Sequence, residues 1–85
     1  MNNDLAVLTT KYVLLEKSPI LSVYHDVEGD WQFMGGEDVT EADAKMVSLH
    51  QIIDLDPSVQ EVLDIETGYM ASRSHVGDNW KITEE

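Results

Sequence analysis

Apolar and polar residues follow one another in short blocks along this 85-residue chain. The clearest apolar blocks are Ile20–Tyr24 and Trp31–Met34, which are rich in β-branched and aromatic residues and flank a polar run that contains Gly29. Such residues suit a half-buried strand, and a glycine beside an aspartate is typical of a turn. In the second block Trp31 and Phe33 fall on one face. The pattern therefore predicts a central β-hairpin that carries the densest part of the core.

Three further short blocks towards the ends of the chain have the character of strands. They are Leu5–Thr9, Tyr69–Ser74 and Trp80–Ile82. Lys45–Val47 fits either a short strand or an extended link. Thr10–Glu16 suits a helix or a strand, and one or two helical turns are favoured because Ser18-Pro19 would end them, since a residue before proline avoids the α region.

Signals for the start of a helix occur three times in the middle of the chain. Thr40 and Ser48 are followed three residues later by Asp43 and Gln51, which is the spacing of a capping box. Asp56-Pro57 places a capping residue before a proline suited to the first helical position. The apolar residues expected to pack across from the hairpin are Ile52, Ile53, Val59, Val62 and Leu63. Strands on both sides of a helical middle predict a small α+β domain, with a mostly antiparallel sheet and two or three short helices packed on one face.

The charge of the chain is its most extreme property. Seventeen acids against five bases give a net charge of −12, and twelve of the acids lie between Asp26 and Glu66 with Lys45 as the only cation there. Affinity for phosphate needs clustered Lys and Arg, so the charge disfavours binding to nucleic acid and to anionic membranes, and neither is expected as a partner. A basic protein partner fits the charge, because complementary fields speed encounter. The alternative is that the acidity only keeps the domain soluble.

The chain contains no cysteine, which excludes disulfides, thiolate zinc sites and a cysteine nucleophile and fits a reducing compartment. The first residues have neither a basic region nor a long apolar run, so neither a signal peptide nor a membrane span is expected. These observations predict a single cytoplasmic domain over residues 1–85, with residues 1–4 frayed.

No group of residues predicts an enzyme, a metal site or a cofactor. The three histidines His25, His50 and His75 are widely separated in the sequence, unlike the close pairs of metal sites. Asp54-Leu55-Asp56 lacks the glycine and the distal glutamate of a calcium loop, and Gly35-Gly36 opens no phosphate-binding loop. A domain that binds a small ligand, or an enzyme whose site is not visible in the sequence, is the alternative to a non-enzymatic interaction domain.

Four acids fall within seven residues: Glu37, Asp38, Glu41 and Asp43. The preceding glycines let this segment project from the scaffold, and loops are where recognition residues concentrate. We interpret these four carboxylates as facing a basic protein partner. The alternative is a solvated loop whose acids favour the start of a helix.

Two single residues are exceptional in their surroundings. Arg73 is the only arginine, and it either pairs with a carboxylate inside the domain or anchors a partner. Trp80 either closes the core or serves as an exposed contact residue.

Three segments between about Pro19 and Trp80 form a combination of motifs: GDWQFMGGE, VSLHQIIDLDPSVQEVLD and GYMASR. In these segments the chain resembles a small bacterial family of domains of unknown function, which is grouped with the candidate immunity proteins of polymorphic toxin systems. The matching positions are Gly29, Trp31, Phe33, Leu49, Ile52, Ile53, Asp56, Pro57, Gly68 and Arg73. This chain has a compact Val27–Asp30 turn where family members often carry a longer loop. The shared motifs are structural, and the resemblance implies an immunity-type inhibitor without catalytic residues.

Overall fold

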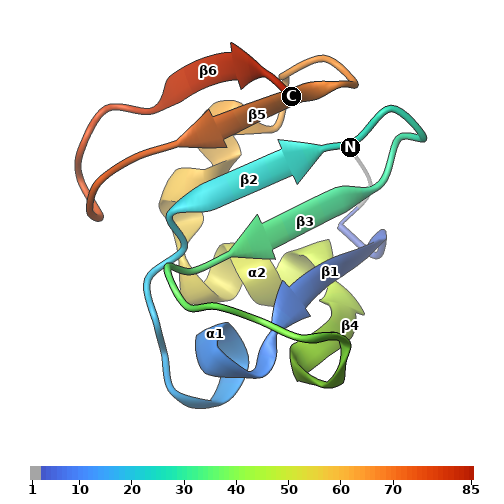
Figure 1. Ribbon diagram of the computed structural model, residues 1–85, viewed down its shortest axis with the longest axis vertical. Coiled ribbons are helices and arrows are strands. Elements are labelled where there is room, and N and C mark those ends of the chain that lie inside the picture. Colours follow the sequence, from blue (N-terminus) through green and yellow to red (C-terminus); the bar gives the residue numbers. More distant parts are fainter. Residues whose placement is uncertain (1–2) are drawn as a thin grey trace.

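The computed structural model describes residues 3–85 and contains one six-stranded sheet with the order β4-β1-β3-β2-β5-β6 (Figure 1). The strands are β1 (Ala6–Thr10), β2 (Ser22–His25), β3 (Trp31–Met34), β4 (Ala44–Ser48), β5 (Tyr69–Ser72) and β6 (Lys81–Glu84). The helices are α1 (Lys11–Leu15) and α2 (Leu49–Leu55), with 3₁₀ helices η1 (Glu41–Asp43) and η2 (Pro57–Val62). Only β1 and β3 pair in parallel, and the other neighbours are antiparallel. The predicted α+β class with a mostly antiparallel sheet is confirmed.

The hairpin β2–β3 occupies the two central positions of the sheet. Trp31 and Phe33 point to the same side and are buried, as the alternation predicts. The core that they join contains Val7, Val13, Ile20, Val23, Leu49, Ile52, Val59, Val62, Ile65 and Ala71. Ile53 and Leu63, which the sequence also places there, are only partly buried and pack against the edge of this core.

Helix starts follow the predicted capping signals. The Ser48 hydroxyl accepts the Gln51 N–H at 3.2 Å and the Gln51 side chain accepts the Ser48 N–H at 3.2 Å, which begins α2. The Asp56 carboxylate accepts the Ser58 N–H at 3.0 Å and begins η2. Within the predicted segment Thr10–Glu16 the helix α1 covers Lys11–Leu15, and the Thr10 hydroxyl caps it by accepting the Val13 N–H at 3.3 Å.

The two ends of the chain differ from expectation. Within the predicted frayed residues 1–4, the Asn3 carbonyl accepts the His50 N–H at 2.9 Å, while residues 1–2 lie outside the described chain. The last strand begins at Lys81, one residue later than predicted. Trp80 instead lies against Arg73, with its ring centroid 4.1 Å from the guanidinium carbon. This contact takes Trp80 out of the strand and onto the core.

The sheet has one covered and one uncovered face. The buried residues of α1, α2 and η2 pack on one side, against Val23 and Phe33 among others, and Figure 1 shows α2 behind the sheet. We call the other side the open face. Its central row, one residue from each strand in register, is Met46, Leu8, Gln32, Tyr24, Met70 and Thr83.

Among residues 3–85 no helix has the length and apolar character that a membrane crossing requires.

Candidate functional site

The acidic segment, residues 37–43, lies at one end of the open face because of the strand order. Since β4 lies beyond β1, the chain that leaves β3 must pass β1 to reach it. Figure 1 shows this connection passing in front of the end of β1, on the same side as the open face. We call residues 37–43 the acidic loop. It therefore forms a border of the open face.

Asp43 holds one end of the acidic loop. Its carboxylate accepts the Thr40 N–H at 3.0 Å and lies 3.3 Å from the Lys11 ammonium, and its side chain is only 10% exposed. The hydrogen bond from the Thr40 backbone, together with the Lys11 charge, lowers the pKa of Asp43 below its ordinary value. The sequence places Asp43 among the partner-facing acids, but in the structure its contacts are to its own chain and its role there is to fix the loop.

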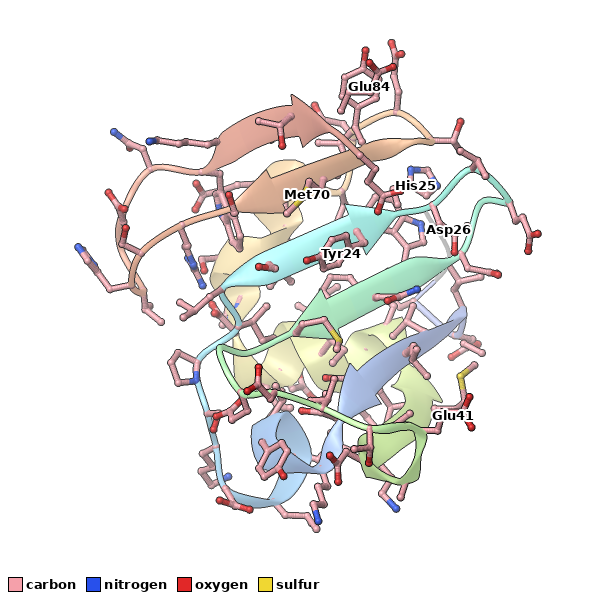
Figure 2. The ribbon with its side chains drawn as sticks, in the orientation of Figure 1. Tyr24, His25, Asp26, Glu41, Met70 and Glu84 are labelled. Atoms are coloured by element: carbon pink, nitrogen blue, oxygen red, sulfur yellow. The ribbon has the colours of Figure 1, made fainter. Side chains whose placement is uncertain are left out.

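Glu37 holds the other end. The Ser18 hydroxyl donates to its carboxylate at 2.5 Å, while the glutamate itself stays exposed. Between the two anchors Asp38 and Glu41 are also exposed, and Figure 2 shows Glu41 at the edge of the molecule beside β4. Three of the four predicted carboxylates are thus presented to solvent on a loop that is tied down at both ends.

We expect Asp43→Asn to lower the melting temperature near neutral pH, and to have little effect in acid. A carboxyl whose pKa is depressed in the folded state stabilises it at a pH above about 4, where the unfolded group is ionised. That stabilisation disappears as the pH falls through the folded pKa. Thermal melts of both proteins across a pH series measure the difference.

The exposed neighbour Asp38 supplies a matched control for this series, because Asp38→Asn removes the same charge. Its melting temperature is expected to follow that of the parent at every pH. A difference between Asp43→Asn and the parent that stays constant down to low pH would contradict the role assigned to the Asp43 carboxylate.

A second acidic border lies at the opposite end of the hairpin strands, in the β2–β3 turn. The Asp26 carboxylate accepts the Glu28 N–H at 2.9 Å and the Asp30 N–H at 3.0 Å, which fixes the turn. Asp26 and Asp30 also line a depression of about 180 Å³ together with Leu8 and Met46. Acids therefore border the open face at both ends of its strands.

The open face itself is apolar, and the sequence interpretation missed it. The alternation in Trp31–Met34 predicts one buried side, but the other side carries Gln32 and Met34, and Tyr24 of β2 and Met70 of β5 continue the row of Gln32. The signal in the sequence that could have indicated this face is the presence of apolar residues on both sides of one strand. Figure 2 shows Tyr24 and Met70 on the viewer's side of the sheet.

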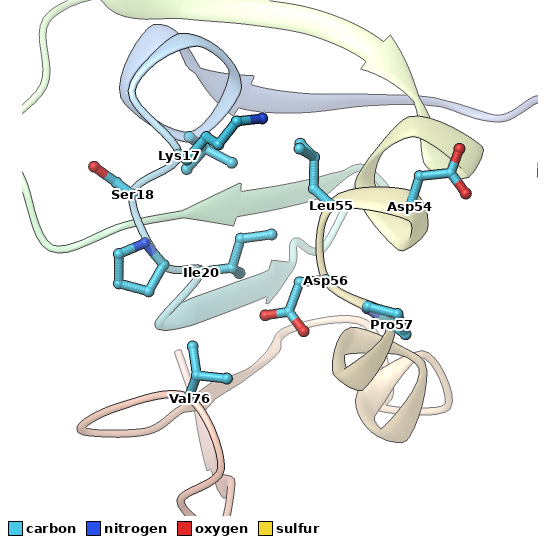
Figure 3. A pocket seen from close by; sticks show the side chains of 10 residues that line it. Lys17, Ser18, Ile20, Asp54, Leu55, Asp56, Pro57 and Val76 are labelled. Carbon is cyan, nitrogen blue, oxygen red and sulfur yellow. The ribbon is translucent and has the colours of Figure 1, made fainter.

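On another side of the molecule a groove of about 520 Å³ lies between the α1–β2 connection, the α2–η2 junction and the loop after β5 (Figure 3). Its walls are largely apolar, with Ile20, Leu55 and Val76 among them. Two acids line it: Asp56 accepts hydrogen bonds from Arg73 at 2.6 Å and from the Ser58 hydroxyl at 2.5 Å, and Asp54 lies 3.2 Å from His50. The groove therefore offers apolar contact rather than a reactive carboxylate.

Over residues 3–85, no three side chains of His, Asp or Glu are grouped so that they could hold a metal ion. His25 lies 2.8 Å, through Nδ1, from the Ile65 carbonyl, and its ring stacks on Trp31 with centroids 3.9 Å apart. His50 pairs with Asp54 on the surface of α2 at 3.2 Å. These two histidines thus contact different parts of their own chain.

No family model, curated protein or solved structure matches the chain. The resemblance to the immunity-associated family therefore stays a prediction that rests on the quoted motifs.

Proposed function

We propose that this chain is a non-enzymatic protein-interaction domain that binds a basic protein through the exposed acids Glu37, Asp38 and Glu41. The observation that carries the proposal is the anchoring of the acidic loop at both ends, by Ser18 on Glu37 and by Lys11 on Asp43. A loop that is already ordered loses little conformational entropy when it binds. Its carboxylates are therefore held ready for a partner.

The charge of the whole chain supports the same function. A net charge of −12 attracts a basic protein over a distance and accelerates encounter, mostly at low salt. An immunity-type inhibitor of a basic toxin is the particular form of this function that the motif resemblance supports. A loop that is only solvated is the competing interpretation, and it differs in its response to mutation.

The test compares two variants with equal charge. One neutralises the loop (Glu37→Gln, Asp38→Asn and Glu41→Gln), and the other neutralises three exposed acids of the η2–β5 region. These control substitutions are Glu61→Gln, Asp64→Asn and Glu66→Gln. Each variant changes the net charge from −12 by three units, to −9. Asp43 is left in place in both, because it supports the loop, and Glu37→Gln keeps a side-chain oxygen that can accept the Ser18 hydroxyl.

We expect the loop variant to associate about tenfold more slowly, or slower still, with a partner recovered from the native lysate and purified. Its association rate should also depend less on ionic strength, whereas the control should stay close to the parent. Stopped-flow or surface-binding kinetics across a salt series give these rates. Equal rates for the loop variant and the control would refute the local role of the acidic loop.

The groove of Figure 3 favours a second candidate function, which is the binding of a small apolar ligand. Its volume of about 520 Å³ lies within the range of about 300–1,000 Å³ that is usual for such sites. Saturable binding of a small molecule that perturbs Leu55 and Val76 in NMR spectra, and is lost in Leu55→Ser, would support this function instead.

A further inference from the structure

We propose that the open face is the centre of the surface on which the basic partner docks, and that the partner's matching surface has an apolar centre surrounded by Lys and Arg. This inference rests on the proposed function and extends it, because it adds the apolar contact and the chemistry of the partner.

The open face departs from the usual pattern of an antiparallel sheet. Such a sheet with one face on the core normally carries polar residues on the other. Here the outward positions include Leu8, Tyr24, Met34, Met46 and Met70. Met46 is 65% exposed, and the other four are half-buried against their neighbours. These five apolar side chains share the face with polar ones, since Gln32 lies between Leu8 and Tyr24 and Ser22 lies beside Met34.

The open face also carries little charge. The six strands contain one acid of the chain's seventeen, Glu84, and it pairs with Tyr69 in the register of the inner side. The cation on the outward side is Lys81, which lies on the edge strand β6. An interface core is depleted in charge in the same way, and its rim is polar.

The residue types fit a contact surface as well. Every methionine after Met1 lies there, namely Met34, Met46 and Met70. Methionine is unbranched and polarizable, so it adapts to the shape of a partner, and both methionine and tyrosine are enriched in protein interfaces. Tyr24 lies between Gln32 and Met70 in the central row, where an aromatic anchor contributes most.

The open face is smaller than a stable interface, so its two acidic borders also belong to the proposed contact surface. Six strands at about 4.8 Å spacing and about 3.3 Å per residue give a rectangle of about 24 by 15 Å. A stable interface covers about 800 Å² on each partner, which is more than this rectangle. A partner seated on the central row therefore also reaches the acidic loop at one end and Asp26 and Asp30 at the other. Those borders require positive charge opposite them.

The same charge argues against two other occupants. A second copy of the chain would bring another −12 against these borders, and like charges facing each other oppose association. A nucleic acid would bring phosphates. The complementary occupant is a basic protein with an apolar centre.

The test uses three synthetic peptides as probes of this chemistry. The first is a short helical peptide with a leucine face bordered by lysines, the second has glutamates in place of the lysines, and the third is an oligolysine without leucines. Binding is followed by NMR on protein labelled with ¹³C at the methionine methyl groups. The signals of Met34, Met46 and Met70 report on the open face.

We expect the leucine–lysine peptide to shift the Met46 and Met70 signals, and to bind at least about tenfold more tightly than either other peptide at physiological ionic strength. The double substitution Tyr24→Ser and Met70→Ser should weaken it about tenfold. A matched control, Leu15→Ser with Val76→Ser, removes two exposed apolar residues away from the open face and should not change the affinity. Met46→Ser is a second test variant, at an exposed edge position that the fold does not need.

Four results would overturn the inference. They are open-face methionine signals that do not move, equal binding of the glutamate peptide, equal weakening by the control variant, and sedimentation as a dimer that Met46→Ser dissociates. The last result would assign the face to a second copy. Failure here is distinct from failure of the proposed function, because the loop variant is tested for association rate on a recovered partner. If the loop variant slows association with that partner but Tyr24→Ser with Met70→Ser does not change binding to it, the proposed function stands. The open face is then not part of the binding surface.

Discussion

Phe33→Ala is expected to lower the free energy of unfolding by about 3–5 kcal/mol, as for other large-to-small substitutions of buried aromatic residues. Phe33 is fully buried on the central strand β3, and its ring lies next to that of Trp31, with centroids 6.2 Å apart. Removing the ring loses its burial and leaves a cavity that the sheet and helices cannot fill. Small domains have about 5–15 kcal/mol of stability in all, so this is a large share. Urea melts at constant pH measure it.

Two companion variants make this measurement decisive. Val27→Ala truncates a residue that is 80% exposed in the hairpin turn, and it should change the stability by about 0.5 kcal/mol or less. Phe33→Leu keeps most of the volume and should cost less than the alanine variant, which keeps the site measurable if that variant does not fold. A loss below about 1 kcal/mol for Phe33→Ala would show that the hairpin is not the centre of the core.

The local parts of the fold were predictable because their signals are local. The β3 strand has the predicted bounds, and the capping box of Ser48 and the cap at Asp56 form as their spacing indicates. In both caps a side chain acts on a backbone group within three residues, so the sequence contains the whole interaction. Boundaries moved where a distant contact intervened, as at Trp80, whose ring stacks on Arg73.

The candidate site could be predicted only in part, for a related reason. The acidic loop is visible as a run of charge, but Asp43 acquires its partner Lys11 only when the loop passes β1. The open face needs the strand order and the parallel pairing of β1 with β3, which join segments that are far apart in the chain. No short stretch of sequence shows that Leu8 and Met70 share one surface.

Arg73 makes contacts to segments that are near in the sequence and to segments that are far from it. Its replacement is the second change with a large expected effect. Its side chain is 1% exposed, and Nη2 donates to Asp56 at 2.6 Å and to the Ile20 carbonyl at 2.9 Å, while Nη1 donates to Ser58 at 2.8 Å. The predicted pairing of Arg73 with a carboxylate inside the domain is confirmed. One guanidinium thus joins the start of β2, the start of η2 and the end of β5.

Arg73→Met should therefore cost about 3–5 kcal/mol, because it leaves a partly buried carboxylate and a buried carbonyl without their donor. Arg73→Lys is expected to recover only part of this loss. An ammonium lacks the planar fork that reaches several acceptors at once, and it stacks less well on Trp80. Denaturant melts of the two variants measure the difference.

Replacing Asp56 tests whether the ion pair with Arg73 or the cap of η2 contributes more to the stability of the domain. As a cap alone, Asp56→Ala would cost about 0.5–2 kcal/mol. Because its carboxylate also pairs with Arg73, we expect a loss of about 3–5 kcal/mol in the parent, falling to the cap value of about 0.5–2 kcal/mol in the Arg73→Met background. The difference is a coupling energy of about 2.5–3 kcal/mol, at the upper end of the range found for contacting residues. Additive losses, within about 0.5 kcal/mol, would mean that Arg73 stabilises the domain through the Ile20 carbonyl and Trp80 and not through Asp56.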